Sequence, residues 1–210
     1  MSSKKMMYLI LKRLFDIIGS LIGCIFLIPV TLIVKICYLI TGDYHTIFYS
    51  QERIGQNGKI FRLYKYRSMV VNADELLEEI LKSDSKEAKE YKSKKKISKD
   101  PRITKAGNFI RKHSIDELPQ LINILFGQMS FIGNRPYLPR EKKDMGKYYK
   151  TIVKTKPGLT GYWQVNLRSR GTFEQRLEME EYYSNNCSLK LDIKIFFKTF
   201  GVVLGCKGAK

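Results

Sequence analysis

The sequence predicts a mainly helical fold with one small β-hairpin, attached to a membrane through its N-terminal part. Three observations predict it: a long apolar tract near the N-terminus, an Asn-Gly turn between two strand-like runs, and apolar stripes at helical spacing elsewhere. We expect residues 1–42 to form a basic N-terminus and a membrane hairpin, and residues 43–210 to form one cytosolic domain with amphipathic surface helices.

The apolar tract, residues 14–40, favours a re-entrant hairpin over a simple anchor. A straight helix of this length would measure about 40 Å against about 30 Å of hydrocarbon, so length alone permits an anchor. Pro29 favours a kink that leaves two halves, each too short to cross. Both flanks are basic, which places both on the cytoplasmic side. We expect Pro29 to break the helix, and Asp16 and Lys35 to reach the headgroups.

The composition limits the classes of binding partner and metal site that the chain can have. The formal net charge is +18, which predicts an anionic partner: nucleic acid, an acidic membrane surface or a phosphorylated substrate. Four scattered cysteines and two histidines argue against a disulfide framework and against a multi-histidine metal site.

After the membrane tract, residues 48–69 read as a hairpin turning at Asn57-Gly58. Basic side chains on or beside its second strand, including Lys65 and Arg67, indicate either a solvated edge or a ledge that faces phosphate. Helices are expected over the charged stretch 72–96, the basic stretch 106–112, and residues 118–126 and 172–184. The C-terminal residues 189–205 are amphipathic, either docked on the core or lying on the membrane.

The adjacent carboxylates Asp116 and Glu117 are the strongest candidate for chemistry, because they lie in a basic neighbourhood. Such a pair can stay ionised, hold a divalent metal or attack phosphorus. Ser114 and Glu117 also fit a helix capping box, whereas Pro119 favours Asp116 as the cap. In either case both carboxylates are expected at the mouth of a helix, which suits phosphate binding.

The chain resembles the monotopic phosphoglycosyl transferases, a bacterial sugar transferase family, in its small form with the catalytic domain only. The landmarks occur in order and run almost end to end: KRLFDIIGS, QERIGQNGKIFRLYKYRSM, DPRITKAGNFIRKHSIDELPQL, GQMSFIGNRP, KPGLTGYWQVN and EEYYSNNCSLKLDIKI.

The resemblance implies transfer of a sugar-1-phosphate from a UDP-sugar to undecaprenyl phosphate, with release of UMP, in the first membrane step of polysaccharide or glycoconjugate assembly. It implies Mg²⁺, a phosphosugar intermediate on Asp116, and Glu117 as the carboxylate associated with the metal. It also implies the re-entrant hairpin at the bacterial inner membrane, with the catalytic domain on the cytoplasmic face among anionic lipids.

Further residues follow by matching the motifs. Arg67 and Arg111 are expected on phosphates, and Arg135, followed by Pro136, on the donor nucleotide. Arg168 is a further candidate, and Glu180 is expected to be a supporting carboxylate. The resemblance leaves the sugar, the pathway and the oligomeric state open.

Three positions depart from the family pattern: Ile28 replaces a common serine, Asn134 a common proline, and Glu180 a common aspartate.

Two other classes of protein could share the high positive charge and the apolar tract of this chain. A basic nucleic-acid-binding protein fits the charge but shows no recognisable motif, so we expect no nucleic acid. A non-catalytic membrane scaffold would share every one of these features. The one observation against it is that Asp116 and Glu117 lie together in a basic sequence context.

Overall fold

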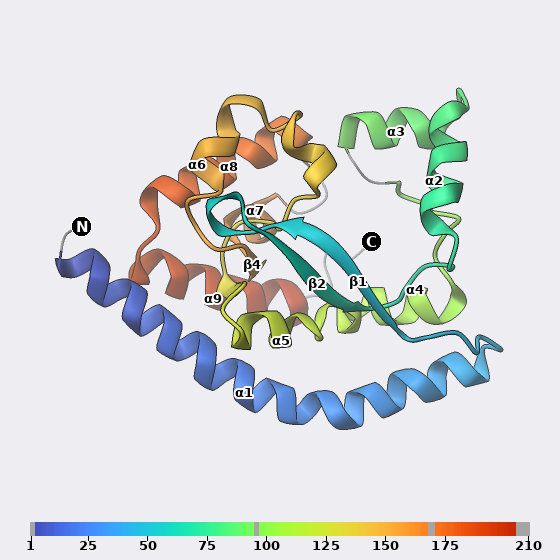
Figure 1. The fold of residues 1–210 in the computed structure, drawn as a ribbon, viewed down its shortest axis with the longest axis horizontal. Coiled ribbons are helices and arrows are strands. Elements are labelled where there is room, and N and C mark those ends of the chain that lie inside the picture. The colour runs from blue at the N-terminus through green and yellow to red at the C-terminus, as the bar shows by residue number, and fades with distance from the viewer. Residues whose placement is uncertain (1–2, 95–96, 168–170, 205–210) are drawn as a thin grey trace.

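The computed structural model describes residues 3–94, 97–167 and 171–204, which are mostly helical, as predicted (Figure 1). The elements in chain order are α1 (Ser3–Ile40), β1 (Phe48–Ile54), β2 (Ile60–Tyr66), α2 (Ala73–Lys82), α3 (Lys86–Lys94), α4 (Lys105–Lys112), α5 (Gln120–Leu125), β3 (Ser130–Ile132), α6 (Tyr149–Ile152), β4 (Gly158–Thr160), α7 (Tyr162–Asn166), α8 (Phe173–Asn186) and α9 (Leu189–Leu204). Short 3₁₀ turns cover Gln56–Gly58, Ile115–Glu117, Pro139–Lys142 and Gly146–Tyr148.

The predicted hairpin is confirmed. Strands β1 and β2 pair antiparallel, from Ile54 opposite Ile60 at the turn to Phe48 opposite Tyr66 at the open end. Asn57 and Gly58 have φ values of 57° and 78°, the left-handed conformation that these two residue types tolerate best. A second pair, β3 with β4, is parallel and was not predicted.

The core lies where α1, α5 and β2 meet. Leu27 of α1 packs with Leu63 of β2 and with Leu121 and Ile124 of α5. A second cluster joins the end of α1 to α4 and β2, and a third lies under α6 and α8. Helix α5 and strand β2 are therefore packed rigidly in the core, and the residues next to them in sequence are held in fixed positions.

The predicted break at Pro29 is corrected, because α1 continues through it as one helix. Figure 1 shows this helix bowed around the underside of the molecule. The physical reason is packing. Leu27 and Val34, on either side of the proline, are both buried in the core, and this burial offsets the lost helix hydrogen bond.

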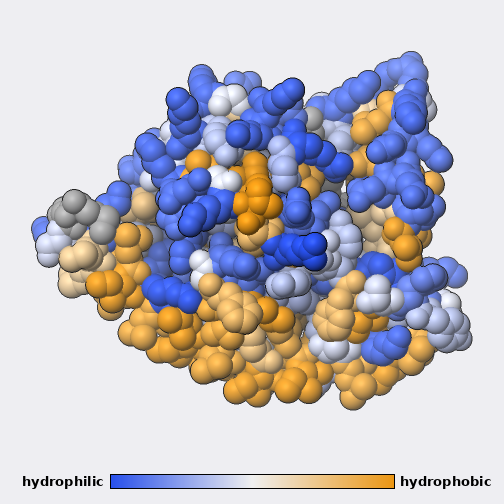
Figure 2. All heavy atoms as spheres, in the orientation of Figure 1, coloured by the Kyte–Doolittle hydropathy of each residue, from blue (hydrophilic) through white to orange (hydrophobic). Residues whose placement is uncertain are grey.

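Helix α1 docks along its whole length. Tyr8 donates to Asp192 of α9, the Thr31 hydroxyl lies 2.6 Å from that of Tyr66 on β2, and Arg67 lies over the Tyr38 ring. The opposite face leaves large apolar side chains exposed from Met6 to Ile40, and Figure 2 shows them as a continuous apolar band along the lower edge. Among the described residues, α1 is the one helix long and apolar enough to cross a membrane.

The close approach of α4 to the segment after β2 can be tested at Gly107 of α4. A Cβ atom there would lie 1.9 Å from the Ser68 carbonyl oxygen, a backbone atom that cannot rotate away. We expect Gly107→Ala to lower the free energy of unfolding by about 3 kcal/mol or more. Gly201→Ala is the matched control, because it meets open space within α9 and should gain about 0.5–1 kcal/mol from helix propensity. Denaturant titration in detergent measures both, and equal effects would contradict the close approach.

Candidate active site

Asp116 and Glu117 lie in the 3₁₀ turn Ile115–Glu117, between α4 and α5. Neither of the two helix caps considered from the sequence is observed. Ser114 has φ 56° and its side chain makes no capping hydrogen bond, and Asp116 does not occupy the N-cap position of α5. Pro119 takes the N-cap position of α5, which is only six residues long. The pair is therefore held by a tight turn, and α5 is too short to supply a long helix dipole, so the positive charge at this position comes from neighbouring side chains.

Glu117 is held by Lys65 of β2. The Lys65 Nζ lies 3.0 Å from Glu117 Oε1, and the Glu117 side chain remains 41% exposed. Burial raises the pKa of Glu117, but Lys65, Arg135 and Arg111 outweigh it and lower the pKa below the usual range. Glu117 is therefore ionised at neutral pH.

Asp116 has a different environment. It is 8% exposed, and burial together with the neighbouring Glu117 raises its pKa to about 6, against the influence of Lys65 and Arg111. Arg111 reaches this position from the last turn of α4. The two adjacent carboxyl groups thus differ: one is stably charged, and the other is desolvated and more basic.

A cleft of about 40 Å³ opens beside Glu117. Its polar lining comes from Arg53, Lys65, Gln120, Arg135 and Gln164, with Pro136 at its edge. Asp116 is not among the lining residues. The Nε atoms of Arg53 and Arg135 and the Oε1 atom of Gln164 are buried without a hydrogen-bond partner. The two arginine Nε atoms are donors without acceptors, which is costly and favours an anion in the cleft, whereas the Gln164 oxygen is an acceptor and favours a donor.

Arg176 of α8 is a further arginine that acts on this region, and its side chain is buried. Burial and Arg135 lower its pKa, and the pKa of Arg53 falls to about 10 for the same two reasons. Arg176 lies over the ring of Trp163, 4.3 Å from its centre. The Trp163 ring is itself buried, and this guanidinium covers one of its faces.

Glu180 lies beneath the loop that carries Arg135. Its Oε1 atom accepts the Arg135 backbone N–H at 3.0 Å, and burial raises its pKa to about 7 although this N–H favours the charged form. Asn134 is buried as well, with its Nδ2 atom 2.6 Å from the Ser184 hydroxyl and 3.1 Å from that of Thr155. The asparagine that departs from the family pattern thus fastens this loop to α8.

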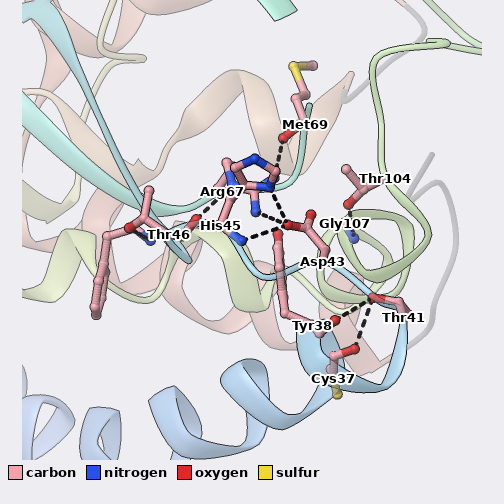
Figure 3. A network of polar contacts seen from close by, with 11 residues as sticks. Cys37, Tyr38, Thr41, Asp43, His45, Thr46, Arg67, Met69, Thr104 and Gly107 are labelled. Carbon is pink, nitrogen blue, oxygen red and sulfur yellow. Dashed lines mark hydrogen bonds and ion pairs between the residues drawn. The ribbon is translucent and has the colours of Figure 1, made fainter. Parts of the chain in front are cut away.

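The structure places Arg67 in a separate network, shown in Figure 3. It forms an ion pair with Asp43 at 2.8 Å and donates to the carbonyl oxygens of Thr46 and Met69. Three nitrogen atoms of the Arg67 guanidinium thus donate to protein oxygens, and these bonds connect the segment after α1 to the end of the hairpin. Its assignment to phosphate stays a prediction. Arg168 lies outside the described residues.

Sequence reasoning missed Arg53, Arg176 and the role of Lys65. Lys65 lies on β2, and Arg67 follows the last residue of that strand, so period-2 spacing relates the two positions. This spacing was the available signal for Lys65. Arg176 lies on a helix far along the chain, and no local pattern distinguishes it.

The metal prediction can be tested against the donor set. No group of three or more His, Cys, Asp or Glu side chains is placed to hold a metal in ranges 3–94, 97–167 and 171–204. Mg²⁺ commonly uses one or two carboxylates and completes its shell with water and substrate phosphates. The exposed Glu117, with Asp116 beside it, fits that pattern.

The chain is similar to a known protein family and to several named bacterial proteins. The model of the bacterial sugar transferase family matches residues 7–206. The chain is 42% identical over 199 residues to the UDP-galactose-lipid carrier transferase of Erwinia amylovora, covering 95% of this chain and 41% of the relative. It is 43% identical over 202 residues to the undecaprenyl-phosphate galactose phosphotransferase of Salmonella typhimurium, with the same coverage of both chains.

A third relative is of similar size. The exopolysaccharide production protein ExoY of Sinorhizobium fredii is 37% identical over 198 residues, covering 94% of this chain and 87% of the relative. The chain spans less than half the length of the two galactose-named relatives. The family model covers nearly the whole chain, and on this ground the chain belongs to the bacterial sugar transferase family.

Proposed function

We propose that the protein transfers a sugar-1-phosphate from a UDP-sugar to undecaprenyl phosphate and releases UMP through a phosphosugar intermediate on Asp116. One observation carries the proposal: a nearly buried carboxyl group adjoins an ionised one beside a cleft that contains unpartnered arginine donors. The names of the Erwinia and Salmonella relatives support the donor and acceptor classes.

In the first step, a carboxylate oxygen of Asp116 forms a bond to the phosphorus that carries the sugar. The bond from this phosphorus to UMP breaks, and its electron pair leaves on UMP. Desolvation raises the basicity of Asp116, which strengthens it as a nucleophile. Arg53 and Arg135 supply the charge that stabilises the departing phosphate.

In the second step, a phosphate oxygen of undecaprenyl phosphate attacks the same phosphorus. The bond to Asp116 breaks, which restores the carboxylate and yields the lipid diphosphate sugar. Two steps let one cleft serve a soluble donor and then a lipid acceptor. Glu117 would hold Mg²⁺ together with donor phosphate oxygens, and the bound ion supplies charge that neutralises the phosphates.

The membrane arrangement belongs to the same proposal. Both ends of α1 are fastened to one side of the domain, so a straight crossing would require the helix to leave its binding surface. We infer that α1 lies re-entrant in the cytoplasmic leaflet of the inner membrane, with its apolar face in lipid and basic residues among anionic headgroups. Phe197 and Phe200 of α9 are exposed and extend the apolar surface.

A UMP-release assay over a panel of UDP-sugars tests the function. With undecaprenyl phosphate in lipid nanodiscs and Mg²⁺, one or more donors should give continuous turnover. Without the acceptor, release should stop at about one UMP per enzyme, the signature of a covalent intermediate.

The rival functions give other outcomes. Salt-sensitive DNA binding with no UMP release would favour a nucleic-acid-binding protein. No release with any donor, and no DNA binding, would favour a scaffold.

A further inference from the structure

We propose that Asp16 of α1 is a positioning residue for Arg135, so that docking of the membrane helix sets the geometry of the donor cleft. The identity of the donor rests on the function proposed above. The carboxylate was expected to reach the headgroups, but it is 2% exposed and points into the protein. Its neighbours in sequence, Phe15 and Ile17, are exposed on the apolar face. A buried carboxylate in such a tract is costly unless it makes specific hydrogen bonds.

Asp16 makes those bonds to the start of β3. Its Oδ1 atom accepts the hydroxyl of Ser130 and the backbone N–H of Phe131, both at 3.0 Å. The Phe131 ring is held from the same helix, because it meets Phe15 edge to face at 5.9 Å. It also lies against Gly19, where a Cβ atom would be 2.7 Å from Phe131 Cε2. Helix α1 therefore fixes both the backbone and the side chain of this strand.

The strand transmits this position to the cleft. Ser130 pairs with Gly158 of β4, and a Cβ atom on Gly158 would lie 2.1 Å from the Gly133 nitrogen. The two backbones therefore approach closely just after β3, and the Gly133 and Gly158 N–H groups donate across this junction to Thr160 O and Asn134 O. Arg135 follows Gly133 by two residues, and its N–H is bonded to Glu180. A displacement at Ser130 is thus carried along a short, tightly packed segment to Arg135.

The position of the Arg135 side chain should affect donor binding. Its Nε is buried without a protein acceptor, and its charge acts on Glu117. Because a shift of about 1 Å in a substrate-binding group can cost about 100-fold in rate, a small movement of the β3 segment should be visible in donor kinetics.

The test is a double-mutant cycle on the full chain in nanodiscs. Asp16→Ala should lower kcat/KM for the UDP-sugar about 10- to 100-fold, mainly through KM. In an Arg135→Ala background the same change should have almost no further effect, since the residue through which Asp16 acts is gone. Ser130→Ala removes one of the two bonds and should give a smaller loss in the same direction.

Ser20→Ala is the control. Ser20 is also buried on the inner face of α1. Among the described residues its hydroxyl donates within that helix alone, to Asp16 O and Ile17 O. It should leave donor kinetics unchanged. Losses from Asp16→Ala and Arg135→Ala that multiply would overturn the proposal, as would equal losses from Asp16→Ala and Ser20→Ala.

Hydrogen exchange of residues 130–135 separates this proposal from the proposed function. Asp16→Ala should reduce amide protection there, and Ser20→Ala should not. If the wild-type protein releases no UMP but this difference is present, the function fails and the mechanical link from α1 to the Arg135 segment stands. If protection is unchanged, the link is wrong whatever the activity.

Discussion

Asp116→Asn is expected to abolish turnover and, at neutral pH, to stabilise the protein. The loss should be about 10⁴-fold or more in kcat, because an amide replaces the carboxylate that we propose as the nucleophile. The stabilisation has a separate cause. Burial raises the pKa of Asp116 from its ordinary value to about 6, so the folded protein binds this proton more tightly than the unfolded chain does. Stability therefore falls as the pH rises from about 4 to about 6.

An asparagine has a similar shape and never takes the charge. Since one pKa unit corresponds to about 1.4 kcal/mol, the variant should gain about 2–3 kcal/mol at pH 7 and almost nothing at pH 4. Denaturant titration at both pH values, in detergent and without divalent metal, measures the gain.

Asp84→Asn is the matched control, because it removes the same charge from a side chain that is 92% exposed. It should be neutral in both assays. Full turnover by Asp116→Asn would exclude the covalent step, and a variant less stable than wild type at pH 7 would contradict the burial of an ionised carboxylate.

The parts of the fold that local chemistry determines could be predicted from the sequence. Asn57-Gly58 demands a left-handed turn, and the hairpin follows from it. The apolar stripes predicted α8 and α9 to within a few residues of their observed bounds. The parallel pair of β3 and β4 could not be predicted, because each strand has three residues and their pairing joins distant parts of the chain.

In the candidate active site, too, some features follow from local sequence and others depend on contacts between distant parts of the chain. The adjacency of Asp116 and Glu117 is visible in the sequence, whereas the difference in their pKa values depends on which one the fold buries. Lys65 and Arg67 are equivalent in strand pattern. The first reaches Glu117, and the second lies at the strand end, where Asp43 meets it. Non-local packing decides between them.

Pro29 shows how packing overrides a local rule. The proline predicts a break, and its residue type costs a helix hydrogen bond wherever it stands in the interior. The apolar side chains that flank it face the core of this domain, and they keep the helix continuous. A sequence pattern alone does not show that this long apolar helix packs against a protein surface along one face.

Lys65→Met is expected to lower kcat/KM by about 10²–10³-fold, the range typical of losing one positioned charge at a reacting phosphate. Two consequences combine. Glu117 loses the ammonium group 3.0 Å from its Oε1 atom, and the cleft loses one of its lining cations. Among the charges acting on Asp116, Lys65 is also the largest that favours its ionised form. Its removal should therefore raise the pKa of Asp116 further above 6.

The pH profile distinguishes this role from a general loss of structure. In the proposed mechanism only the ionised form of Asp116 attacks, so turnover of the wild type should fall as the pH drops through about 6. In Lys65→Met that fall should begin at a higher pH, whereas Lys65→Arg should keep the wild-type profile and recover part of the rate. Lys59→Met removes the same charge from an exposed position just before β2 and should change neither the rate nor the profile. A rate loss in Lys65→Met with an unshifted profile would mean that Lys65 serves the substrate phosphates alone and does not set the ionisation of the nucleophile.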